Sequence, residues 1–143
     1  MIVLDCCAAI EIARRTEIGL AYKNLFFSDE EIIAPSLYQA EVVNVAWKYV
    51  HGKALSRTTA HEVMETALAL PNRYIPIDDL MVEAFSQGVI LDHSIYDMIY
   101  MILARRNGAT LVTVDKHLQS LCLDNGVDCI IDEDVLNKNS RAS

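Results

Sequence analysis

Hydrophobic and polar positions along the chain predict short buried strands separated by helices. The first segment, MIVLD, is apolar and β-branched, which is typical of a buried strand, here ending at Asp5. The segments EIIAPS, YIPID and ATLVTVD have the same character, and a shorter segment, VDCII, follows near the end of the chain. We therefore expect four to five strands, of which the first ends at Asp5 and the fourth at Asp115.

The segments between these strands carry the spacing and the caps of helices. The helices expected from this pattern are two short ones within residues 6–27 and five more over about 36–52, 56–70, 79–89, 94–108 and 116–124. Ser36 with Gln39 three residues later has the pattern of a capping box, Ser94 is placed to cap a later helix, and Gly108 is placed to end it.

Strands that alternate with helices predict an α/β fold with a mainly parallel central sheet and helices on both faces. In such folds the functional site lies at the carboxyl ends of the strands. The length fits one domain, which we place at residues 1–131, followed by a polar and loosely structured tail over 132–143.

Composition and charge narrow the classes of protein that the chain can belong to. With 52% hydrophobic and 22% charged residues it is globular, and a net charge of −8, taken alone, argues against a protein that binds nucleic acid by phosphate neutralisation. An acidic site that recruits a cation, or a basic protein partner, fits this charge better. No apolar run approaches a membrane span, no signal peptide is expected, and the four cysteines lack a CxxC pair, so we expect reduced thiols in a cytoplasmic protein.

Four acidic residues stand out because their surroundings are apolar. Asp97 interrupts the run from Ile95 to Ala104, although burying an unpaired carboxylate costs several kcal/mol. Asp5 and Asp115 close two strands, and Glu41 lies about 40° from the apolar stripe of its helix at 100° per residue. If the strands are parallel and adjacent, these four acids converge at one edge of the sheet.

Converging carboxylates repel one another, and a divalent cation removes that conflict. Oxygen ligands without Cys or His favour Mg²⁺ or Mn²⁺. Each acid also has a structural interpretation: Asp97 as part of a capping box with Ser94, Asp5 and Asp115 as helix caps, and Glu41 as a half-solvated flank residue. The histidines are scattered and the small basic clusters, including Lys48, fit solvated helix ends, so we expect no catalytic role for either.

The segments MIVLD, APSLYQAEVVNVAWKYV and HSIYDMIYMILARRNGATLVTVD, in this order and spacing, resemble PIN-domain ribonucleases, most closely the VapC-type toxins of toxin–antitoxin pairs. The resemblance implies an α/β/α sandwich and an acidic pocket that binds Mg²⁺ or Mn²⁺ and cleaves RNA with water activated by the metal. The residues that match the family's catalytic and metal-binding acids are Asp5, Glu41, Asp97 and Asp115. Thr113 and Asn44 match residues that support this site.

One position departs from the family pattern. Two residues after the first aspartate the family usually has Ser, Thr or Asn, whereas this chain has Cys7, a weaker hydrogen-bond donor. The resemblance also implies a homodimer and a cognate antitoxin that blocks the pocket. An alternative is a weakly active or inactive PIN fold that serves as a binding or regulatory module. A phospho-acceptor receiver domain ranks last, because LDCC supplies only one acid after the first strand.

Overall fold

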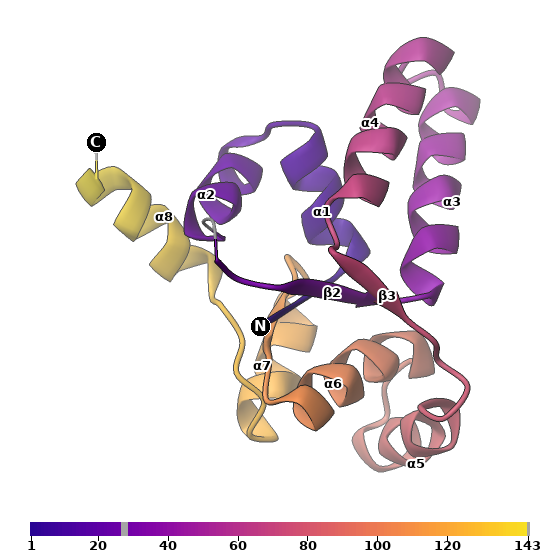
Figure 1. Cartoon of the computed structure of the whole chain (residues 1–143), viewed down its shortest axis with the longest axis vertical. Helices are drawn as coiled ribbons and strands as arrows, with labels where there is room; N and C mark the ends of the chain where they lie inside the picture. Colours follow the sequence, from indigo (N-terminus) through magenta and orange to yellow (C-terminus); the bar gives the residue numbers. More distant parts are fainter. Residues whose placement is uncertain (27–28, 143) are drawn as a thin grey trace.

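Four short parallel strands form the centre of the molecule (Figure 1). The structure is a computed structural model of the chain and describes residues 1–26 and 29–142, so the last residue of the predicted helical segment 6–27 and the last residue of the predicted tail lie outside the described residues. The strands are β1 (Ile2–Leu4), β2 (Ile32–Pro35), β3 (Arg73–Ile75) and β4 (Thr110–Val112), in the order β3-β2-β1-β4. This order places β1 between β2 and β4, so the predicted parallel sheet is confirmed.

Helices cover both faces of the sheet, as the alternation of strands and helices predicted. The helices are α1 (Cys6–Ala13), α2 (Glu17–Leu25), α3 (Leu37–His51), α4 (Arg57–Ala69), α5 (Met81–Leu91), α6 (Ile95–Asn107), α7 (Lys116–Asp124) and α8 (Asp132–Ala142). Figure 1 shows α1 to α4 above the sheet and α5 to α7 below it, with α8 beside α2. The architecture is therefore an α/β/α sandwich.

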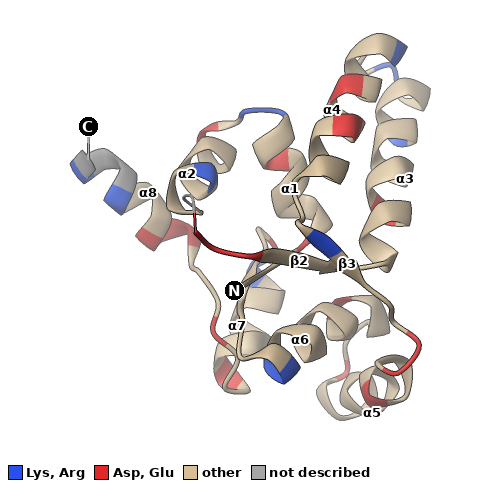
Figure 2. Ribbon diagram, viewed as in Figure 1, with Lys and Arg blue, Asp and Glu red and all other residues tan. Residues whose placement is uncertain are grey.

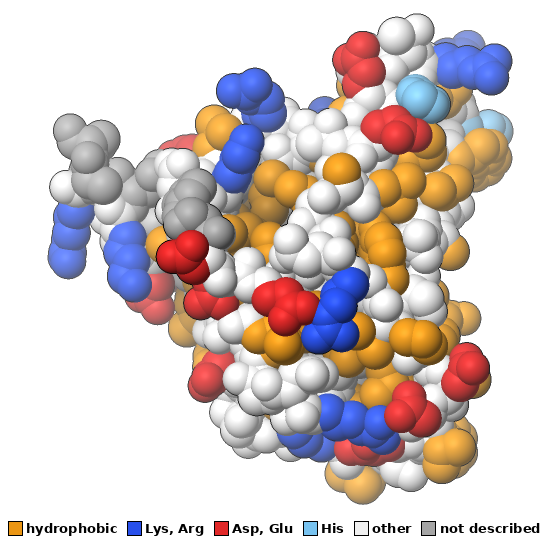
Figure 3. Space-filling view, viewed as in Figure 1, with side chains coloured by type: hydrophobic (Ala, Val, Ile, Leu, Met, Phe, Trp, Pro, Cys, Tyr) orange, Lys and Arg blue, Asp and Glu red, His pale blue; other side chains and the backbone are white. Residues whose placement is uncertain are grey.

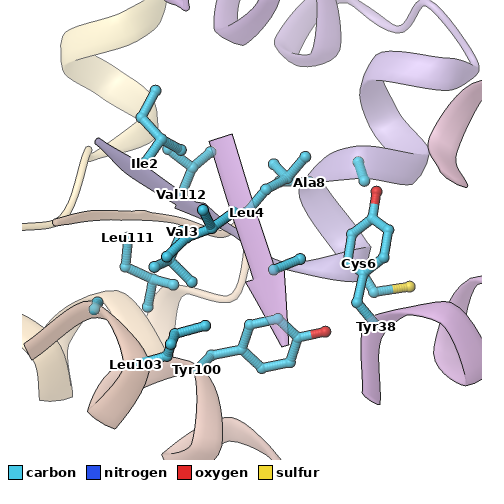
Figure 4. Packing of buried hydrophobic residues seen from close by; sticks show 14 of the residues in the cluster. Ile2, Val3, Leu4, Cys6, Ala8, Tyr38, Tyr100, Leu103, Leu111 and Val112 are labelled. Carbon is cyan, nitrogen blue, oxygen red and sulfur yellow. The ribbon is translucent and has the colours of Figure 1, made fainter. Parts of the chain in front are cut away.

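The core forms where β1 lies between the two helical layers (Figure 4). All three residues of β1 are buried, and the buried rings of Tyr38 on α3 and Tyr100 on α6 flank the sheet from opposite sides. Residues 98–104 of α6 are all buried, which explains why the sequence there is apolar on every face of the helix. Tyr38 donates its hydroxyl to the carbonyl of Ala67 at 2.6 Å, so its buried oxygen is satisfied.

Two predictions about the end of the chain were wrong. The segment VDCII forms no strand; it contributes an isolated bridge between Cys129 and Leu111. The tail is not loose, because Asp132–Ala142 forms α8 with Val135 buried against the core. Asp132, which begins this helix, accepts hydrogen bonds from the side chains of Tyr22 and Gln119. The polar composition of the tail therefore gave no signal of this helix, to which buried Val135 and the hydrogen-bonded Asp132 both belong.

The predicted caps are confirmed at some helix ends and wrong at another. Ser94 accepts a hydrogen bond from the first turn of α6, and Gly108 ends this helix at a positive φ of 57°. Ser56, the first residue of the expected helix 56–70, caps α4 in the same way. Ser36 does not cap α3, because its backbone is already helical and its side chain makes no cap hydrogen bond. Its N–H instead donates to the carbonyl of Ile75, the last residue of β3. In the described part of the chain, no helix has the length and apolarity required to cross a membrane.

Candidate acidic active site

A hollow of about 360 Å³ at the carboxyl edge of the sheet is lined by all four acids singled out from the sequence. Asp5 directly follows β1, Asp115 follows β4, Glu41 lies on the second turn of α3, and Asp97 lies on the first turn of α6. The other residues that line it are Cys6, Cys7, Asn44, Val45, Lys48 and Val114. The parallel order β2-β1-β4 is what brings these separate segments to one place.

Asp5 is the most deeply buried of the four acids, with 6% of its surface exposed. Its Oδ2 accepts hydrogen bonds from Thr113 Oγ1 at 2.8 Å and from Cys7 Sγ at 3.2 Å. Burial raises the pKa of Asp5, and the charge of Asp97 raises it further, although the two side-chain hydrogen bonds oppose the shift. Asp5 does not cap α1 with its side chain, so the capping interpretation is wrong for this residue.

Cys7 contacts the two side chains that a hydroxyl at its position would contact. Its Sγ lies 3.2 Å from Thr113 Oγ1 as well as 3.2 Å from Asp5 Oδ2. Burial and the nearby Asp5 charge raise the pKa of this thiol, which therefore keeps its proton and can donate it. Cys7 therefore contacts Asp5 and Thr113, but its thiol is a weaker hydrogen-bond donor than the hydroxyl that the family usually has there.

Glu41 is oriented by a buried tyrosine from the opposite helical layer. The hydroxyl of Tyr100 donates to Glu41 Oε1 at 2.6 Å, and Figure 4 shows that the Tyr100 ring points from α6 toward α3. Burial raises the pKa of Glu41, with smaller contributions from the charges of Asp5 and Asp97, while the Tyr100 hydrogen bond lowers it. The carboxylates therefore interact across the pocket, as their convergence predicted.

Asp97 is held by a histidine that the sequence analysis did not assign to the site. His93 Nε2 lies 2.7 Å from Asp97 Oδ2, and the His93 ring is in edge contact with the ring of His117, with centroids 4.7 Å apart. Ser94 caps α6 through the N–H of Tyr96, so the cap hydrogen bond of this helix comes from Ser94. The four-residue spacing from His93 to Asp97, about one helical turn, was a signal in the sequence that pointed to this contact.

Asp115 caps a helix and also lines the acidic pocket. Its Oδ1 accepts hydrogen bonds from the backbone N–H groups of His117 and Leu118, so it caps α7, and the residue also lines the acidic pocket. Thr113 is fully buried and links the two strand-end acids, because its Oγ1 donates to Asp5 and accepts from the N–H of Asp115. The supporting role predicted for Thr113 has a clear geometric basis here.

Asn44 and Lys48 line the same pocket from successive turns of α3. Asn44 was a predicted supporting residue, whereas Lys48 was interpreted as part of a solvated helix end. At the end of α6, Arg106 is paired within the protein, because it forms ion pairs with Asp79 and Glu83. Figure 2 shows the basic positions at the end of α6 and an acidic position on α5. Lys48 is thus a positive charge at a site where every other charged residue is acidic.

The donor set suits a hard divalent cation, although the carboxylates are not gathered around one point. One oxygen of each acid is held by a partner within the protein, and a carboxylate has a second oxygen that it can offer to a metal. Among residues 1–26 and 29–142, however, no three His, Cys, Asp or Glu side chains lie close enough to hold a metal as they stand. Burial, and to a smaller extent the repulsion between the carboxylates, raises the pKa values of Asp5 and Glu41, and a divalent cation would relieve both.

The comparisons with known proteins identify the class to which this fold and pocket belong. The family model of the PIN domain matches residues 2–122, a range that includes all four acids. The chain therefore belongs to the PIN domain family, whose members are generally nucleases. Its fold is similar to the crystal structure of PAE2754 from Pyrobaculum aerophilum, with a TM-score of 0.71 and 18% identity over 98% of this chain and 89% of that chain. A search of curated proteins finds no match.

Proposed function

We propose that this protein is a divalent-metal-dependent endoribonuclease and the toxin component of a type II toxin–antitoxin system. The observation that carries the catalytic part is the acidic pocket, where Asp5, Glu41, Asp97 and Asp115 meet at the carboxyl edge of the sheet. Membership of the PIN domain family supports a nuclease. RNA is the substrate that the resemblance of the sequence motifs implies.

The four acids would hold Mg²⁺ or Mn²⁺, both of which prefer oxygen ligands. When bound, such an ion activates water and stabilises the charge that develops on a phosphate under in-line attack. The protein's own residues fix the ligands: Thr113 and Cys7 orient Asp5, Tyr100 orients Glu41, and His93 orients Asp97. Partners of this kind typically change metal affinity or activity about 10- to 100-fold when removed.

We infer that Lys48 and Asn44, which line the same pocket, contact the RNA beside these acids. The Lys48 ammonium can form an ion pair with a phosphate next to the scissile one, and the Asn44 amide can donate a hydrogen bond to a phosphate or a ribose oxygen. One lysine compensates little of the repulsion between a chain of net charge −8 and RNA. Bound cations and contacts to the bases therefore have to supply much of the affinity for the substrate.

The antitoxin part of the proposal rests on the family resemblance and on charge. A basic peptide segment that crosses the acidic pocket would neutralise the same carboxylates that a metal neutralises, so inhibition and metal binding would compete. The net charge of −8 favours such a partner. Removal of Asp97 is expected to weaken binding of this peptide together with metal binding.

The homodimer part is supported by an exposed apolar face on α5. The side chains that form this α5 face are Met81, Val82, Phe85, Val89 and Ile90, and all of them are exposed. Figure 3 shows hydrophobic side chains over α5 at the lower edge of the molecule. Exposed apolar patches of this kind usually mark protein interfaces. Light scattering tests the dimer, which Phe85→Glu on this face should dissociate. Phe26→Glu is unsuitable as a control, because Phe26 packs on the core and its replacement would disturb the fold.

A second candidate is a weakly active or inactive PIN module that binds without cutting. Two observations favour it: Cys7 is a weak donor to Asp5, and no three of the described His, Cys, Asp or Glu side chains are gathered for a metal. Cleavage of RNA, measured together with metal binding, separates the two candidates. A nuclease requires a cation at the four acids, whereas a binding module does not.

The deciding experiment measures cleavage of cellular RNA by purified, antitoxin-free protein with Mn²⁺ or Mg²⁺. We expect cleavage that stops in EDTA and is lost in Asp97→Asn, with Asp124→Asn on the exposed end of α7 as a matched control. Isothermal titration with Mn²⁺ should show binding to the wild type and much weaker binding to Asp97→Asn. Equal cleavage by both proteins would indicate a contaminant and would contradict the catalytic proposal. Metal binding without cleavage of any RNA would favour the module.

A further inference from the structure

Tyr96 is an exposed aromatic residue directly beside the acidic pocket. It precedes Asp97 on the first turn of α6 and is 57% exposed, whereas Tyr100, one turn later, is fully buried. The apolar and Met-rich sequence around Tyr96 favours a core position over an interface, and the structure contradicts this for Tyr96 because its side chain is exposed. In the described part of the chain the Tyr96 side chain makes no hydrogen bond or ring contact.

A second hollow connects Tyr96 to the acids. It has a volume of about 300 Å³ and is lined by Leu37, Ala40, Glu41, Asn44 and Tyr96. Glu41 and Asn44 also line the acidic pocket, so the two hollows are adjacent along the same face of α3. A chain bound with one phosphate over the acids can therefore extend into this second hollow.

The chemistry of the second hollow matches a nucleobase better than it matches a phosphate. Leu37 and Ala40 supply an apolar wall, the Tyr96 ring supplies a flat aromatic face, and the Asn44 amide can both donate and accept hydrogen bonds at the rim. Glu41 disfavours an anion there. Proteins that bind single-stranded nucleic acid commonly stack bases on such exposed aromatic side chains.

We propose that Tyr96 and this hollow form a base-binding subsite, in which the phenol ring stacks on a base next to the phosphodiester held at the acidic pocket. This inference deepens the proposed function and rests on it, because it takes single-stranded RNA as the substrate. It also addresses the charge of the chain. Since Lys48 is the only cation that lines the acidic pocket among the described residues, stacking gives the RNA an affinity that does not depend on phosphate neutralisation.

The binding test uses short single-stranded RNAs that carry 2-aminopurine at one position each, with protein in the Asp5→Asn background to prevent cleavage. We compare this background with versions that also carry Tyr96→Phe, Tyr96→Leu or Tyr96→Ala. Stacking predicts quenched fluorescence at one position, retained by Tyr96→Phe and lost in Tyr96→Leu and Tyr96→Ala. Anisotropy should show that Tyr96→Ala weakens binding by about 5- to 150-fold, the range expected for one stacked base. An abasic nucleotide at the quenched position should remove the difference in RNA affinity between the Asp5→Asn background and its Tyr96→Ala version.

The kinetic test uses the chain with Asp5 intact. Tyr96→Ala should raise KM with little change in kcat, and Tyr96→Phe should match the wild type. Wild-type quenching, affinity and KM in Tyr96→Ala would overturn the subsite while leaving the nuclease proposal in place. A protein that cuts no RNA but shows quenching dependent on Tyr96 would overturn the nuclease and support the subsite. A Tyr96→Ala protein that changes only its oligomeric state or its peptide binding would identify a protein contact and overturn the subsite.

Discussion

His93 Nε2 and Asp97 Oδ2 lie 2.7 Å apart, across one turn at the start of α6. The His93 side chain is largely buried, and its ring also contacts the edge of the His117 ring at the start of α7. The orientation of the Asp97 carboxylate in the pocket therefore depends on its contact with His93. Carboxylates that bind metals are commonly oriented by hydrogen bonds of this kind from residues outside the ligand set.

Replacement of His93 by Ala is expected to reduce cleavage about 10- to 100-fold, because Asp97 loses the partner that fixes its carboxylate. His93→Gln, which can still donate a hydrogen bond, should lose less. The matched control is His61→Ala, since His61 is exposed on α4 and contacts only Glu65 among the ion pairs described. Manganese affinity and cleavage are measured together. If both stay at the wild-type level in His93→Ala, the contact does not position Asp97.

Substitutions at Asp115 are expected to separate its role as a helix cap from its role as an acid of the pocket. Asn is about as good a helix cap as Asp, so Asp115→Asn should keep the stability of the fold while weakening metal binding and cleavage. Asp115→Ala removes both roles and should cost about 0.5–2 kcal/mol of unfolding free energy as well. Urea unfolding measures the difference, with Ser120→Ala on the exposed side of α7 as the control. Equal stability of Asp115→Asn and Asp115→Ala would argue against the cap.

Much of the fold and of the acidic site could be predicted from the sequence, because both depend on local patterns. Apolar segments gave the strands, and the alternation with helices gave the parallel order that brings Asp5 and Asp115 to one edge. The predictions failed where the outcome depended on tertiary contacts. The segment around Cys129 was long enough for a strand, but only one bridge to Leu111 forms.

The roles of His93 and Lys48 show the same limit within the site. A histidine in polar surroundings is usually exposed, and nothing local to His93 shows that His117 will pack on it from another helix. Lys48 became a pocket residue because α3 starts at the carboxyl end of β2 and runs past the acids. Tyr96 and Tyr100 have similar local sequences, and only the packing of α6 exposes one and buries the other.

Stability of the metal-free protein is expected to fall as pH rises above about 4.5. The pKa of Glu41 is raised from 4.5 in the folded state, mainly by burial. Between 4.5 and the raised pKa the folded state therefore holds a proton that the unfolded chain has released, so rising pH favours unfolding, and above the raised pKa the penalty is constant. Asp5 adds a contribution of the same sign that starts from 3.8.

Glu41→Gln removes this ionisation and keeps a carbonyl that can accept the Tyr100 hydrogen bond. In EDTA it should be more stable than the wild type at pH 7 and should lose less stability as pH rises from about 4.5 to 7. Glu62→Gln on exposed α4 should behave as the wild type. Added Mn²⁺ should stabilise the wild type more than Glu41→Gln, because it binds the folded carboxylates. A Glu41→Gln protein that is less stable than the wild type at pH 7 in EDTA would contradict the repulsion argument.

Cys7→Ser is expected to preserve or increase cleavage. Burial and the Asp5 charge keep the Cys7 thiol protonated, so it acts on Asp5 only as a weak donor. A serine hydroxyl at the same position is a stronger donor to the same Oδ2 and can also bond Thr113 Oγ1, which restores the family's usual group. Cys7→Ala leaves Asp5 with Thr113 as its side-chain donor and should lower cleavage and metal affinity.

The order of activity expected is therefore Cys7→Ser at or above the wild type, and Cys7→Ala below it. Cys129→Ser is the matched control, because Cys129 is a partly buried free thiol outside the pocket whose sulfur makes only a long contact to a neighbouring carbonyl. Thermal unfolding checks that all three variants fold. If Cys7→Ala cuts RNA as well as Cys7→Ser, Thr113 alone is sufficient to orient Asp5. If Cys7→Ser gains cleavage well beyond the wild type, the natural thiol limits the activity of this pocket, and the protein is a weakened nuclease whose acids remain competent.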